Sequence, residues 1–160
     1  MKKLTALFTV VAMLVCMFTF APAASAAEMY DSQGETVYGS DVLRKPDGTT
    51  ITVNFSLECH NGWLDGTFGS DFVCATMSAS TEIGSCSASI DVMANYISNG
   101  SYTSESDSGS ASSLGRSGMS VSIYPNTDLL SSGNADFEVD HSTYGNASGS
   151  LTAYCPTAVK

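Results

Sequence analysis

Residues 87–96, which read SASIDVMANY, decide the fold of this chain. Apolar or small residues alternate there with residues that are mainly polar. Because successive side chains of an extended chain point to opposite faces, this pattern predicts a strand with one buried and one exposed face. The stretch is long for a strand and contains neither Pro nor Gly, so we expect a central strand. Its buried series is Ala88, Ile90, Val92, Ala94 and Tyr96.

The same alternation predicts further strands on both sides of this one. The clearest covers residues 49–59, TTITVNFSLEC, and the turn Lys45-Pro46-Asp47-Gly48 joins it to residues 42–45. Asn99-Gly100 is a strong hairpin signal, whereas residues 108–118, SGSASSLGRSG, are predicted to be flexible by composition. The other predicted strands cover residues 35–38, 72–78, 101–107, 119–123, 135–143 and 151–155.

No helical periodicity follows the apolar N-terminal run. Short strands with one polar face each, separated by turns, predict an all-β fold of two antiparallel sheets packed together. An antiparallel β-sandwich with an immunoglobulin-like layout is our first interpretation, and a small closed β-barrel is the alternative. The Trp packed on an inter-sheet disulfide that marks an immunoglobulin domain is not at matching spacing here. The resemblance is therefore to an architecture only.

The N-terminus has the three parts of a secretory signal peptide. Lys2 and Lys3 precede an apolar run over residues 4–20, and Ala24-Ser25-Ala26 supplies small residues for cleavage after Ala26. The run is near the lower limit for spanning a bilayer and has no basic stop after it, which disfavours an anchor. The MKK start and short run are typical of bacterial export. We predict a secreted protein with a signal peptide at 1–26, a flexible arm at 27–34 and one domain at 35–160.

Charge excludes some partners. The formal net charge is −10, and removing Lys2 and Lys3, with no acid lost, takes it to −12. So acidic a surface repels phosphate, which argues against nucleic acid and against anionic membranes after signal cleavage. Solubility outside the cell is the simplest consequence of the charge.

Four cysteines remain after cleavage, and an even count in an exported chain predicts two disulfides. Cys74 and Cys86 are equidistant from Ser80, so a turn there predicts a hairpin that pairs them. Cys59 and Cys155 are expected at the same end of the sandwich, which predicts the second bond. The nearest alternative joins Cys59 to Cys74. Zinc is disfavoured because the spacings are wide and no CxxC occurs.

The loop at residues 60–71 carries the predicted ligand-binding residues: Trp63 with Asn61 and Asp65. A loop Trp beside polar groups can stack on a sugar or anchor a partner, and it can equally fold down to cap one end of the sandwich. The EF-hand pattern is missing from this loop. Asp136, Glu138 and Asp140 form an acidic row, interpreted as a solvated sheet face because alternate residues on a strand lie too far apart to chelate a cation unaided. No metal site or cofactor is predicted.

Two main classes of function follow. The first is a secreted, non-enzymatic binding or interaction module for an extracellular glycan or protein, with Trp63 as its recognition residue. The second is a small extracellular hydrolase that uses carboxylates, for which Glu58, Asp65, Asp71 and His141 are the available groups. His141 shares the parity of the predicted core residues, which favours a hydrogen-bonded structural role. An exported bacteriocin-like factor fits the size and secretion. Converging carboxylates would favour the enzyme, and an apolar patch around Trp63 the binder.

Overall fold

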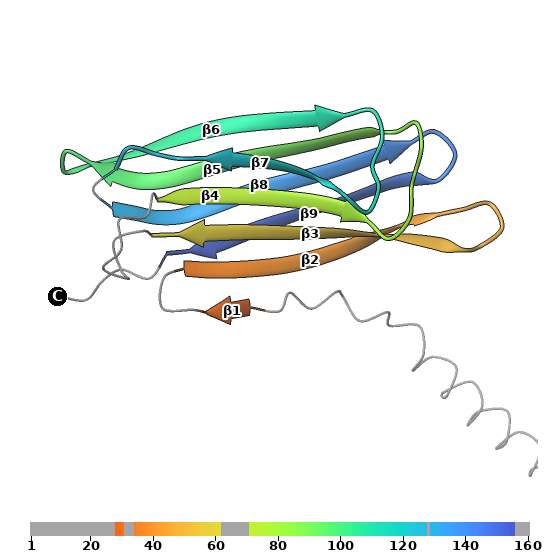
Figure 1. The fold of residues 1–160 in the computed structure, drawn as a ribbon, viewed down its shortest axis with the longest axis horizontal. Coiled ribbons are helices and arrows are strands. Elements are labelled where there is room, and N and C mark those ends of the chain that lie inside the picture. Colours follow the sequence, from red (N-terminus) through yellow and green to blue (C-terminus); the bar gives the residue numbers. More distant parts are fainter. Residues whose placement is uncertain (1–27, 31–33, 62–70, 128, 156–160) are drawn as a thin grey trace, which may run out of the picture.

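The computed structural model describes residues 28–30, 34–61, 71–127 and 129–155. Within them the chain forms nine strands in two antiparallel sheets and no helix (Figure 1). Sheet A has the order β1-β2-β3-β4-β7, and sheet B has the order β6-β5-β8-β9. The predicted all-β sandwich is confirmed, and the closed barrel is not formed. The strands are β1 (Glu28–Tyr30), β2 (Gly34–Arg44), β3 (Thr50–His60), β4 (Phe72–Ala79), β5 (Ser87–Ser98), β6 (Ser101–Ala111), β7 (Met119–Ile123), β8 (Leu129–His141) and β9 (Gly145–Tyr154).

Two predicted turns are confirmed, and each follows from its residues. The Lys45-Pro46-Asp47-Gly48 turn joins β2 to β3, with Gly48 at a φ of 83°. The Asp47 carboxylate accepts hydrogen bonds from the backbone N–H and the hydroxyl of Thr49, and these bonds lower the pKa of Asp47. Asn99 and Gly100 both have positive φ, which the tight hairpin between β5 and β6 requires.

The strand order follows the immunoglobulin-like layout. β3, β4 and β7 correspond to strands A, B and E of that layout, and β6, β5, β8 and β9 to strands C′, C, F and G. β1 and β2 add two strands outside this set, beyond β3. β5, which contains residues 87–96, lies between β6 and β8, as predicted for a central strand.

The core lies between the two sheets and follows the predicted alternation. Phe55 of β3 and Phe137 of β8 stack across it, with ring centroids 4.9 Å apart. Gly133 and Gly149 face inward, and an added Cβ would lie 2.5 Å from Val73 Cγ1 and 2.8 Å from the Phe55 ring. The sheets therefore approach closely because these positions lack side chains. The largest fully buried side chains are Leu43, Ile51, Leu57, Met77, Ile90 and Leu130.

Three predictions about strands are wrong. The hairpin expected around Ser80 does not form, because β4 belongs to sheet A and β5 to sheet B. Residues 28–30, predicted to be part of a loose arm, pair with β2, which itself runs for 11 residues rather than forming a short edge strand. Residues 108–111, predicted to be flexible, continue β6. Composition alone suggested flexibility there, but the ladder with β5 orders the small residues.

One seam of the sandwich is closed by hydrogen bonds between β2 and the β8–β9 hairpin. The Arg44 N–H donates to the Tyr144 carbonyl at 3.1 Å. The Asp41 carboxylate accepts from the N–H of Val42 on its own strand and of Ser148 on β9, at 2.8 and 3.0 Å. The Glu35 carboxylate, which is buried, accepts from the Tyr154 N–H. Side chains of β2 thus satisfy backbone groups at the free edge of β9.

Candidate functional site

The outer face of sheet B carries a shallow hollow of about 270 Å³ over β5, β8 and β9. Outward-facing side chains alternate with the buried ones, so each strand contributes only polar residues to it. Three of the lining residues are carboxylates and three carry hydroxyls. Phe137 and Gly149, whose Cβ positions face the core, complete the lining through their backbone. The polar lining residues are Asp91, Asp136, Glu138, Ser89, Ser148 and Ser150.

Strand register brings these side chains together. Asp91 of β5 lies directly opposite Asp136 of β8, which in turn lies opposite Ser150 of β9. The Ser150 hydroxyl donates to the Asp136 carboxylate at 2.5 Å. Like charges directly opposite each other on neighbouring strands destabilise a sheet, so Asp91 and Asp136 concentrate negative charge at some cost in stability.

The next row of the same face repeats the arrangement. Ser89 of β5 lies opposite Glu138, and Glu138 lies opposite Ser148 of β9. This hollow, called the groove below, therefore offers carboxylate acceptors next to hydroxyl groups that both donate and accept. Asp140, the third member of the predicted acidic row, lies beyond the groove opposite Ser87 and Asn146. Within the described residues, no group of three His, Cys, Asp or Glu side chains has an arrangement that would hold a metal ion.

Of the three ligand-binding residues predicted in the 60–71 loop, the structure describes only Asn61. Trp63 and Asp65 lie outside the described residues. Asn61 is only 3% exposed, so its side chain lies in the interior, where the predicted ligand-binding role does not fit. Sequence alone gave no sign of this, because Asn is commonly exposed in glycine-rich loops.

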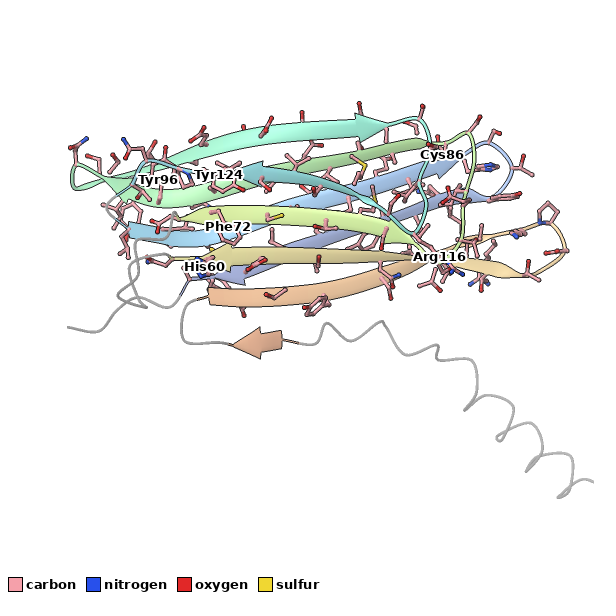
Figure 2. The ribbon with its side chains drawn as sticks, in the orientation of Figure 1. His60, Phe72, Cys86, Tyr96, Arg116 and Tyr124 are labelled. Carbon is pink, nitrogen blue, oxygen red and sulfur yellow. The ribbon has the colours of Figure 1, made fainter. Side chains whose placement is uncertain are left out.

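An aromatic row crosses the outer face of sheet A (Figure 2). His60 of β3 stacks on Phe72 of β4, with ring centroids 5.0 Å apart and planes 15° apart. Tyr124, which follows β7, lies 6.1 Å from Phe72 at a tilt of 45° and is 66% exposed. Because the His60 and Phe72 rings cover each other's faces, the row is a set of cross-strand contacts rather than a flat stacking surface.

Of the groups suggested for a hydrolase, Asp65 lies outside the described residues, and Glu58, Asp71 and His141 do not meet. Glu58 lies on the outer face of sheet A, in a cross-strand row with Thr36 and Cys74, whereas Asp71 is buried just before β4. His141 ends β8 at the other end of the sandwich (Figure 1). Its Nδ1 accepts from the N–H groups of Thr143 and Tyr144, and its ring stacks on Tyr144 at 3.9 Å. The structural role predicted for His141 is thereby confirmed.

Of the four described cysteines, all of them thiols in the structure, two are neighbours and two lie apart. Cys59 and Cys155 are buried neighbours at one end of the sandwich. The Cys59 thiol, burial and the nearby acids Asp71 and Glu35 raise the pKa of the Cys155 thiol. This contact agrees with the predicted Cys59–Cys155 bond, which stays a prediction. Cys74 faces outward on β4, and Cys86 lies at the other end of the sandwich (Figure 2). The Cys74–Cys86 bond thus loses the hairpin geometry on which it was predicted.

Comparison with known proteins assigns no family to this chain. No family model, no curated protein and no solved structure matches it. Among the described residues, no helix is long and apolar enough to cross a membrane. The function must therefore be argued from the groove. Sequence reasoning found two of its acids, Asp136 and Glu138, but missed Asp91 and the serines, because only the register of β5, β8 and β9 unites them.

Proposed function

We propose that the protein is a secreted, non-enzymatic binding module that holds a glycan in the acidic groove of sheet B. The observation that supports binding at this place is the convergence of Asp91, Asp136 and Glu138 with three serine hydroxyls in one hollow. Converging carboxylates are also what a hydrolase would use, but all three are exposed on an open sheet face, which does not enclose a substrate as an active site does. A carboxylate accepts strong, charge-assisted hydrogen bonds, which suits neighbouring hydroxyls of a sugar. The hydroxyls of Ser89 and Ser148 supply donors for the oxygens of the sugar ring and its links, whereas the Ser150 hydroxyl donates to Asp136.

The size and charge of the groove narrow the ligand further. A hollow of about 270 Å³ suits one or two sugar rings, and its position on an open sheet face leaves room for a longer chain to continue. No described residue that lines the hollow is a Lys or Arg, so its three carboxylates favour a ligand that carries an ammonium group, as amino sugars do. A protein partner would have to present a Lys or Arg side chain to the same groups.

Secretion is supported by the sequence rather than by the fold. The N-terminal 26 residues have the basic, apolar and small-residue parts of an export signal. The even number of cysteines after the predicted cleavage site is typical of an oxidising compartment. An extracellular location gives a glycan-binding module access to cell-wall or matrix polysaccharides.

The test uses the mature domain on a glycan array, followed by titration calorimetry with the glycans that bind. Asp136→Asn and Asp91→Asn remove one groove charge each, and we expect at least a tenfold loss of affinity, which corresponds to about 1.4 kcal/mol. Asp140→Asn is the matched control, since it removes the same charge from the same face outside the groove and should change affinity less than twofold. Equal binding by all three variants, each folded by circular dichroism, would refute the groove assignment.

A further inference from the structure

The four edges of the two sheets are not protected equally. In sheet A, β1 has 3 residues and β7 has 5, and short edge strands offer little to a pairing chain. Beyond residues 35–37, which pair with β1, the edge of β2 lies against the β8–β9 hairpin, where the Tyr144 carbonyl accepts from Arg44. In sheet B, the β9 edge is covered by Asp41 and Glu35 of β2. β6 is different, because it has 11 residues and pairs only with β5. It is exposed from Ser101 through Ser108.

The hydrogen bonds at β9 establish which backbone groups of β6 point off the sheet. Ser148 and Tyr154 donate to β2, so the even-numbered residues of β9 direct their backbone groups away from β8. In an antiparallel sheet, two residues that lie opposite each other direct their backbone groups either both toward or both away from each other. Following the opposed residues from β9 through β8 and β5 to β6 gives the direction of the backbone groups of each β6 residue. The free edge therefore presents the N–H and C=O groups of Tyr102, Ser104, Ser106, Ser108 and Ser110. The Ser108 N–H, which accordingly bonds to the Asp107 carboxylate rather than to β5, agrees with this assignment.

The side chains of β6 do not discourage an added strand in the usual way. It contains no Pro and no Lys, the residues that most often block edge pairing. Its only charged side chains are Glu105 and Asp107, two residues apart near its centre. An antiparallel second copy of β6 paired about this centre would place Glu105 or Asp107 opposite another acid, and like charges opposite each other destabilise the pair. A basic strand would instead gain two favourable pairs.

We propose that the free edge of β6 binds an extended segment of another protein by strand addition, and that this segment carries Lys or Arg at two positions two residues apart. Main-chain hydrogen bonds to Ser104 and Ser106 supply affinity, and the two acids select the basic side chains. The segment must come from another protein, because the basic residues of this chain never stand two apart. They are Lys2, Lys3, Arg44, Lys45, Arg116 and Lys160.

This interaction surface is separate from the groove. Glu105 and Asp107 share the parity of Ala94 and Val92, which face the core side of β5, whereas the groove lies on the opposite face of sheet B. At β6 the strand extends past the cover of sheet A, so both acids are exposed. Binding of a basic strand at the β6 edge and of a glycan in the groove would therefore be independent.

The experiment titrates a nine-residue Thr/Val peptide with Lys at positions 4 and 6 into the mature domain labelled for NMR. Shift changes are expected at the amides of Ser104, Ser106 and Ser108. Ser106→Pro removes an N–H that is not bonded to β5, so the fold should persist while affinity falls at least tenfold. Ser106→Ala keeps the backbone groups and should bind as the native domain does.

Charge selection is tested separately. Glu105→Lys should weaken binding of the Lys peptide at least fivefold, whereas Asp140→Lys, the same charge reversal away from β6, should change it less than twofold. A peptide of the same composition with adjacent lysines should bind more weakly. Unchanged affinity in folded Ser106→Pro, or equal binding of the adjacent-lysine peptide, would overturn the proposal. So would self-association of the native domain that Ser106→Pro abolishes, since β6 would then bind a second copy.

Discussion

Asp41 links the two sheets at the scale of a single residue. Its carboxylate accepts from Val42 on β2 and from Ser148 on β9, so one side chain satisfies two backbone donors at a sheet edge. The sequence does not reveal this role, because Asp41 falls between the strands predicted at residues 35–38 and 42–45. The partner residue lies 107 positions away, and only the packed sandwich brings the two together.

Removing the Asp41 carboxylate should loosen this seam. We expect Asp41→Ala to lower the free energy of unfolding by about 1–2 kcal/mol, since two backbone N–H groups lose their acceptors. Asp41→Asn keeps one acceptor oxygen and should cost less. Asp140→Ala, at an exposed site, should stay within about 0.5 kcal/mol of the native value. Urea unfolding followed by circular dichroism measures all three, and an Asp41→Ala variant as stable as Asp140→Ala would contradict the bridging role.

At the scale of the strand, alternation predicted nearly every element of the sandwich. β3, β4, β5 and β7 begin and end within two residues of their predicted limits, because their apolar residues are large and regularly spaced. Only parts of β2 were predicted, at residues 35–38 and 42–45. The end of β6 and the first residues of β8 and β9 were missed, since glycines and serines there resemble a linker or a turn. The structure shows what those glycines do: an added Cβ at Gly109 would lie 2.6 Å from Val121 Cγ2 of the facing sheet. Close packing between sheets, not flexibility, explains this glycine.

Gly133→Ala tests the same effect in β8. The added methyl would lie 2.5 Å from Val73 Cγ1, so we expect a loss of about 1–3 kcal/mol in unfolding free energy. Gly39→Ala is the control, because its Cβ would meet the end of the flexible Leu151 side chain at 3.2 Å. In the double variant with Val73→Ala, the cost of Gly133→Ala should shrink. A Gly133→Ala protein as stable as the native one would show that the sheets are farther apart than described.

At the scale of the whole molecule, β3 and β9 run in the same direction, which places Cys59 and Cys155 at one end. The prediction of direction along the chain succeeded here because hairpins reverse the chain predictably. The hairpin predicted to pair Cys74 with Cys86 does not form, because the sequence does not say whether a turn stays within one sheet or crosses to the other. The groove could not be predicted for a related reason. Its strands β5 and β8 are neighbours in sheet B although β6 and β7 lie between them in the sequence.

A disulfide between Cys59 and Cys155 would close most of the domain into one loop. We expect its removal in Cys59→Ala/Cys155→Ala to lower the free energy of unfolding by about 4 kcal/mol in the chain-entropy model. Cys74→Ser, on the outer face of β4, should change it by less than about 1 kcal/mol. Peptide mapping of the purified protein without reductant gives the connectivity, and a peptide that links Cys59 to Cys74 would refute the pairing.

NMR titration of the native mature domain with a glycan that binds on the array tests the binding proposal most directly. We predict that the largest amide shift changes lie on the outer face of sheet B, at Asp91, Asp136 and Ser150, and that Asp136→Asn abolishes them. Residues of the aromatic row on sheet A, such as Phe72 and Tyr124, should not respond. Shift changes centred on Phe72 and Tyr124, with Asp91 and Asp136 unaffected, would contradict the groove as the binding site.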